Sequence, residues 1–180
     1  MPLASEELET EFHQLVKRQL PTLDPPVTHY LAHLFATARV PPWEDIKVHW
    51  VGTTHIEVPE QPDERTSALR LKLGHSRRMG DGCLVLSTFY REETSRTQPP
   101  IDLVVRVGEA GYKTAGFYAA IVGEGKEIVY PVLADEFPQI VVRLGPSLFE
   151  HYLRDRNPPR RVVLHTPYGE RFFRVRYSMS

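Results

Sequence analysis

Four apolar segments follow one another between Ile101 and Leu144, and they constrain the fold more than any other feature of the sequence. None is longer than seven residues, and each is rich in β-branched or aromatic side chains and bounded by Gly, Pro or Asp. Runs of this kind are typical of buried strands and are short for buried helices. We therefore expect a central β-sheet formed by residues 101–107, 117–122, 127–133 and 139–144. Its predicted core residues are Leu103, Val105, Ile121, Val129, Val141 and Leu144.

Two helices are expected before this sheet, at residues 5–20 and 24–38. The first has Ser5 as an N-cap, acidic residues in its first turn and basic residues in its last turn. The second begins after Asp24 with two prolines, which tolerate the first helical positions because their missing N–H has no partner to lose there. Short turns elsewhere indicate further strands, so the predicted class is α+β with a mostly antiparallel sheet. These strands are expected at 46–50, 55–58, 69–73, 83–91, 161–165 and 171–177, with a short helix at 146–156.

The length of 180 residues, 41% of them apolar, suits one globular domain spanning residues 1–180. We expect a helical hairpin over residues 1–40 and the sheet with its short helix over residues 44–180. A chain of this size buries roughly 70% of its unfolded surface. It therefore needs no metal or disulfide to fold, and the sequence implies no small-molecule cofactor.

A reducing cytoplasm is the expected compartment. Cys83 is the only cysteine, so no internal disulfide is possible. The first residues are acidic and do not resemble a signal peptide, and no apolar run approaches the ~20 residues that span a bilayer. We therefore expect no membrane partner.

Charge is distributed unevenly along the chain. The net charge of -1 combines about -7 over residues 1–64, +1 over 65–138 and +5 over 139–180. Such asymmetry suits contact between the acidic and basic parts, either within one chain or between copies of the chain. Our first hypothesis is a non-catalytic binding or structural-assembly protein that acts through protein–protein contacts, including head-to-tail self-association of these two parts.

Arginines beside aromatic residues form the predicted binding face. Guanidinium groups next to rings suit protein interfaces as well as phosphate contacts and base stacking, so a nucleic-acid-associated protein is the first alternative. Two further arginines lie at residues 74–82, where glycines at both ends predict a flexible connection. The predicted binding residues are Arg160, Arg161, Phe172, Arg174, Arg176, Arg77 and Arg78.

A metal-dependent phosphodiester hydrolase is the second alternative. Asp102, Glu109 and Lys113 have the residue types by which two carboxylates hold Mg²⁺ and a lysine steadies a phosphate or hydroxide. Enzymes of this kind normally place a glutamate and the lysine two residues apart on one face of a strand, whereas Glu109 and Lys113 are four residues apart. The sequence therefore favours a protein that is not an enzyme, and we assign no catalytic residue.

The histidines and the cysteine offer further candidates. His29 and His33 lie four residues apart on the second predicted helix, with His13 as a possible third ligand on the first. His49 and His55 flank a predicted turn and could approach each other. Cys83 could act as a nucleophile with His75 or His165 as its base. We expect the histidines to be solvated, Cys83 to be a core residue, and no transition metal to be bound tightly.

Overall fold

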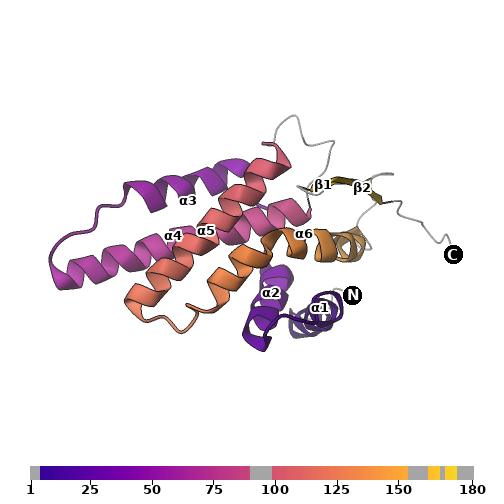
Figure 1. Ribbon diagram of the computed structural model, residues 1–180, viewed down its shortest axis with the longest axis horizontal. Coiled ribbons are helices and arrows are strands. Elements are labelled where there is room, and N and C mark those ends of the chain that lie inside the picture. Colours follow the sequence, from indigo (N-terminus) through magenta and orange to yellow (C-terminus); the bar gives the residue numbers. More distant parts are fainter. Residues whose placement is uncertain (1–4, 90–98, 154–161, 167–168, 174–180) are drawn as a thin grey trace.

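The computed structural model describes residues 5–89, 99–153, 162–166 and 169–173, and these residues form a helical protein (Figure 1). The predicted α+β class with its central sheet is therefore wrong. In the described part of the chain the elements are α1 (Ser5–Gln19), α2 (Pro25–Thr37), α3 (Trp43–His55), α4 (Pro62–Thr88), α5 (Ile101–Val122), α6 (Val129–Leu153), β1 (Val162–Thr166) and β2 (Gly169–Phe173).

Two of the predicted central strands, 101–107 and 117–122, are the two ends of α5. The next run, 127–133, contains the start of α6, and 139–144 lies inside that helix. Gly108 and Gly111 were expected to separate strands, but they lie on the buried side of α5. A Cβ atom on Gly111 would lie 2.7 Å from the backbone nitrogen of Gly80 in α4. These glycines therefore let two helices approach closely, and this tertiary contact outweighs their poor helix propensity.

Most of the other strands predicted before residue 92 are also helical. The predicted strand 55–58 is absent as well: His55 ends α3, and residues 56–58 form neither helix nor strand. Residues 46–50 lie in α3, residues 69–73 lie in α4, and most of 83–91 forms the end of α4. Leu69 and Leu73 are buried because they are four residues apart on one side of the helix, whereas Leu71 between them is exposed. Residues 146–153 of the expected short helix are the last part of α6, which continues through Pro138 and Pro146, and residues 154–156 lie outside the described residues.

The N-terminal helical hairpin is confirmed as α1 and α2. Phe12 and Val16 of α1 belong to the same buried cluster as Val27 and Leu31 of α2. Of the two predicted C-terminal strands, residues 162–165 lie in β1 and residues 171–173 lie in β2, and these two strands pair antiparallel with Val162 opposite Phe173. Residues 161 and 174–177 of the predicted strands lie outside the described residues. This hairpin is the only sheet in the residues that the structure describes, and it does not include the expected central strands.

Helices α4 and α5 cross in the middle of the molecule, with α3 along one side of α4 and α6 beside α5 (Figure 1). The α1–α2 hairpin packs against α6. Leu103 and Ile121, both expected in the core, are 40% and 50% exposed. They are eighteen residues apart, which is five helical turns, so both lie on the same exposed side of α5. The other expected core residues are buried: Val105, Val129, Val141 and Leu144.

Candidate functional site

A carboxylate and two tyrosines join three helices at the centre of the protein. Asp81 follows Gly80 on α4, where the close contact with Gly111 brings Tyr112 of α5 alongside it. The Tyr112 hydroxyl donates a 2.8 Å hydrogen bond to Oδ1 of Asp81, and the Tyr30 hydroxyl of α2 donates a 2.7 Å bond to the same oxygen. Each hydroxyl therefore finds an acceptor, and α2, α4 and α5 are joined through one atom.

Burial controls the protonation of these three side chains. It raises the pKa of Asp81 above its usual value of 3.8, although the two tyrosine hydrogen bonds and the nearby charges of Arg77 and Lys126 oppose this effect. Burial also raises the pKa values of Tyr30 and Tyr112, and the charge of Asp81 raises them further. The tyrosines are therefore hydrogen-bond donors at neutral pH, and ionised Asp81 is held at a cost in free energy.

Arg77 lies one turn before Asp81 and is partly buried near Tyr130 of α6. The side chain of Tyr130 is buried, and its hydroxyl makes no hydrogen bond of standard geometry within the described residues. Burial, together with the charge of Glu124, raises the pKa of Tyr130 to about 12, while the Arg77 guanidinium acts in the opposite direction. The Arg77 guanidinium and the Tyr130 hydroxyl thus lie next to the Asp81 cluster.

A pocket of about 570 Å³ opens beside this cluster between α2, α4 and the start of α6. Two lysine or arginine cations line it, Arg77 and Lys126, against one carboxylate, Asp81. The ammonium group of Lys126 lies 5.7 Å from the centre of the Tyr30 ring. The pocket is lined by Pro26, His29, Tyr30, His33, Leu34, Thr37, Arg77, Asp81, Gly125, Lys126 and Val129.

Arg77 also lines a second cavity of about 430 Å³, and Arg70 and Glu124 are among the other lining residues. The volume of the first pocket falls in the range of small-molecule sites, about 300–1,000 Å³. Its apolar lining residues suit an organic group, and its cations suit a negative charge. The arrangement can therefore hold a small anionic molecule and fix its orientation through the hydrogen-bonding groups around Asp81.

The structure separates the two arginines that the sequence placed in a flexible loop. Arg77 and Arg78 both lie in α4, but Arg77 lines the pocket whereas Arg78 is exposed on another face of the helix. Phe172 lies in β2, opposite Val163 in the strand pairing. The remaining predicted binding residues lie outside the described residues: Arg160, Arg161, Arg174 and Arg176.

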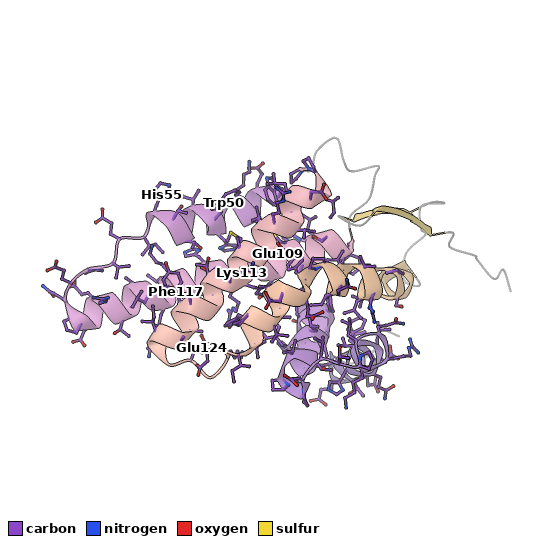
Figure 2. The ribbon with its side chains drawn as sticks, in the orientation of Figure 1. Trp50, His55, Glu109, Lys113, Phe117 and Glu124 are labelled. Carbon is purple, nitrogen blue, oxygen red and sulfur yellow. The ribbon has the colours of Figure 1, made fainter. Side chains whose placement is uncertain are left out.

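The candidate hydrolase residues share one helix. Asp102, Glu109 and Lys113 follow one outward stripe of α5, and Figure 2 shows Glu109 and Lys113 along the exposed side of this helix. Asp102 and Glu109 are seven residues apart, about 10 Å along the axis, so they do not meet at one point. Within the described ranges, no three His, Cys, Asp or Glu side chains gather closely enough to hold a metal ion.

The other candidates are only partly brought together. The rings of His13 and His29 lie 6.5 Å apart between their centres, and His33 contacts Glu9 at 3.2 Å. His49 does not pair with His55; its Nδ1 lies 3.1 Å from Nδ1 of His75. Cys83 is buried, which raises the pKa of its thiol and disfavours the nucleophilic thiolate.

Four residues of this site were not predicted from the sequence: Asp81, Tyr112, Tyr130 and Lys126. The expected flexible connection at 74–82 hid Asp81, because glycines on both sides of an acid are typical of a turn. One signal was present: Tyr30 lies on the apolar stripe of the second predicted helix, and a buried tyrosine hydroxyl needs a partner. Pairing that tyrosine with an acid elsewhere in the chain required the tertiary structure.

Comparisons of this chain with protein-family models, with curated proteins and with solved structures give no match. Among the described helices, none combines the length and the apolar composition needed to cross a bilayer. The pocket beside Asp81 is therefore the feature that bears on function.

Proposed function

We propose that this chain is a non-catalytic binding protein that holds a small molecule with one anionic group in the pocket between α2, α4 and α6. The observation that carries the proposal is the charge of the lining: Arg77 and Lys126 face a single carboxylate, Asp81. Oδ1 of that carboxylate already accepts hydrogen bonds from Tyr30 and Tyr112. One positive charge is therefore left for a ligand.

Two further features support an anion at this place. The positive end of the α6 dipole begins at Val129, which lines the pocket. Burial disfavours the negative charge of Asp81, and protonation of this acid would leave both cations without a carboxylate in the lining. Pro26, Leu34 and Val129 supply an apolar wall, so we expect a carboxylate or phosphate monoester on a small apolar body.

Binding can be tested with a panel of probes matched in shape and different in charge. Monocarboxylates and phosphate monoesters of increasing apolar size are titrated by calorimetry beside the corresponding neutral alcohols and amides. The anionic probes should bind and raise the melting temperature, because a ligand that binds only the native state stabilises it. Equal binding of neutral and anionic probes would contradict the proposal.

The two adjacent arginines give a matched pair of variants. Arg77→Met should weaken binding of the best anionic probe roughly tenfold or more, since a hydrogen bond to a charged group contributes about 1.5–3 kcal/mol. Arg78→Met removes the same charge from another face of α4 and should bind like the unmodified protein. Lys126→Gln, at an exposed lining residue, is the second pocket variant if Arg77→Met alters the circular dichroism spectrum. Equal affinities for all four proteins would contradict the proposed site.

Other proposed partners depend on residues outside the described part. Head-to-tail assembly and nucleic-acid binding both use Arg160, Arg161, Arg174 and Arg176, and they stay predictions. If either occurs, replacing Arg174 and Arg176 by Ala should weaken association and its dependence on salt. A cytoplasmic location is likewise a proposal, supported by the single cysteine.

A further inference from the structure

Helix α3 packs on α4 through an unusually polar contact. Only Ile46 and Thr53 of this helix are buried, whereas Val48 and Val51 are exposed. The Thr53 hydroxyl lies 3.3 Å from the Ser76 hydroxyl, and the ammonium group of Lys72 donates a 3.1 Å hydrogen bond to the carbonyl oxygen of Thr53. Little apolar surface therefore holds α3 in place, and its docking depends on hydrogen bonds.

Two histidines lie at the centre of this contact. Nδ1 of His49 in α3 and Nδ1 of His75 in α4 are 3.1 Å apart, so one imidazole donates and the other accepts. The His75 ring rests on the α3 backbone, because a Cβ atom added to Gly52 would lie 2.7 Å from it. The bond requires an unprotonated nitrogen on one of the two rings. When both rings are protonated, each nitrogen carries a proton and the two positive charges repel each other.

We propose that the His49–His75 pair is a pH-dependent switch, which holds α3 against α4 at neutral pH and releases it in mild acid. The charges around the pair are Asp45 on α3 and Arg78 on α4, with Lys72 one turn away. Arg78 acts against protonation and Asp45 favours it, so the two partly offset each other. The tight distance between the two nitrogens leaves no room for water to separate the charges.

The direction of the effect follows from the protonation of His49. Burial, followed by His75 and Arg78, lowers the pKa of docked His49 below its usual value of 6.5. The docked state consequently binds fewer protons than the released state. Docking is complete above about pH 6.5, and it is lost as the pH falls below that value.

The chain contains its own reporter for this movement. Both of its tryptophans, Trp43 and Trp50, lie on α3, so intrinsic fluorescence reports this helix selectively. Trp43 packs against the core and Trp50 is exposed; Figure 2 labels Trp50 on the outer part of α3. Release of α3 should shift the emission to longer wavelength by exposing Trp43.

The experiment is a pH titration from 7.5 to 5.0 in buffer with EDTA, followed by fluorescence, circular dichroism and hydrogen exchange. Fluorescence should change while helical circular dichroism stays constant. Protection of the α3 amides, corrected for intrinsic exchange, should fall up to tenfold per pH unit for each proton taken up. A constant emission and constant α3 protection over this range would overturn the proposal.

Three variants distinguish release of α3 by the His49–His75 pair from a general effect of acid on the protein. His75→Gln cannot be protonated, so it should abolish the fluorescence transition, and His49→Gln serves as the second variant if the first does not fold. His33→Gln removes an exposed histidine of α2 that contacts Glu9, and it should keep the transition. A transition of the same midpoint in a folded His75→Gln or His49→Gln protein would also overturn the proposal.

Discussion

Helix α4 is held on two sides by different chemistry. Toward α5 the two helices approach closely at Gly80 and Gly111, and the contact continues into the part-buried Asp81–Tyr112 hydrogen bond. Toward α3 the contact consists of paired imidazoles, two hydroxyls and a lysine. At Gly80 and Gly111 the first contact contains no group that titrates, and its one acid, Asp81, lies beside this point. The second depends on protons and on hydrogen bonds that water can replace.

This difference predicts a hierarchy of stability within one helical core. Close packing of α4 on α5 should contribute to the global free energy of unfolding, whereas the α3 contact should decide only whether that helix stays docked.

Gly111→Ala should have the largest effect. The new Cβ would lie 2.7 Å from the Gly80 nitrogen and 3.0 Å from the Ser76 carbonyl oxygen, and these backbone atoms can move only if the helices separate. We expect a loss of about 2–3 kcal/mol in the free energy of unfolding, measured in urea. Gly74→Ala is the control, because nothing lies within 4 Å of its new Cβ, and it should gain about 0.5–1 kcal/mol from helix propensity. Equal midpoints for the two variants would contradict the close contact.

Asp81→Leu should lower stability by about 2–3 kcal/mol, because it leaves the hydroxyls of Tyr30 and Tyr112 buried without an acceptor. Asp81→Asn keeps an acceptor oxygen and removes the charge, so its stability at pH 7 should equal or exceed that of the unmodified protein. Thermal unfolding measures both variants. If Asn proves as damaging as Leu, the network depends on the charge of Asp81 rather than on its hydrogen bonds.

The raised pKa of Asp81 predicts that the stability difference between Asp81→Asn and the unmodified protein depends on pH. The pKa of Asp81 is raised above 3.8 in the folded state, so the native protein binds this proton more tightly than the unfolded chain. The contribution of Asp81 to stability therefore falls as the pH rises above 3.8 and is constant once the folded-state pKa is passed. The difference in melting temperature between Asp81→Asn and the unmodified protein should grow in favour of Asn over that window. A difference that is constant with pH would show that burial does not perturb this acid.

Thr53→Val should cost about 1 kcal/mol by leaving the buried Ser76 hydroxyl without its partner. The loss should appear as faster hydrogen exchange in α3 and leave α5 unchanged. Thr54→Val makes the same substitution on the exposed side of α3 and is the matched control. Equal acceleration of exchange in α3 and α5 would show that the two contacts of α4 are not independent.

Gly52→Ala should have the smallest global effect, within about 0.5 kcal/mol, since improved helix propensity offsets the displacement of His75. Its consequence should be local: the His75 ring is pushed away from His49, and the acid-induced change in tryptophan fluorescence is weakened. Fluorescence titration of this variant beside the unmodified protein measures the effect. An unchanged transition would show that the histidine contact does not require the glycine.

The sequence predicted the helices at the N-terminus because capping residues, acidic first turns and a helical period agree there. It failed between Ile101 and Leu144 because each apolar run was considered separately. Gly108, Gly111 and Gly116 were interpreted as breaks, although each lies where a neighbouring side chain or backbone comes close. Leu103 and Ile121, eighteen residues apart and both exposed, show the helical period that the separate runs concealed.

The candidate site was less predictable than the fold. Arg77 was predicted as a binding residue from its charge, but the sequence could not distinguish it from Arg78. Adjacent residues of a helix point in different directions, and only the tertiary structure shows that Arg77 is the one that lines the pocket. The partners of Asp81 come from positions 51 residues before it and 31 after it. Local patterns do not contain such contacts, and only the packing of α2, α4 and α5 creates them.

Hydrogen exchange at neutral pH, resolved by helix, measures the stability of the two contacts of α4 separately. The amides of α5 and of the facing part of α4 should open only with global unfolding, and those of α3, residues 43–55, should open at a clearly lower free energy. Exchange of α3 and α5 at one common free energy would contradict the account, because the two sides of α4 would then form a single cooperative unit.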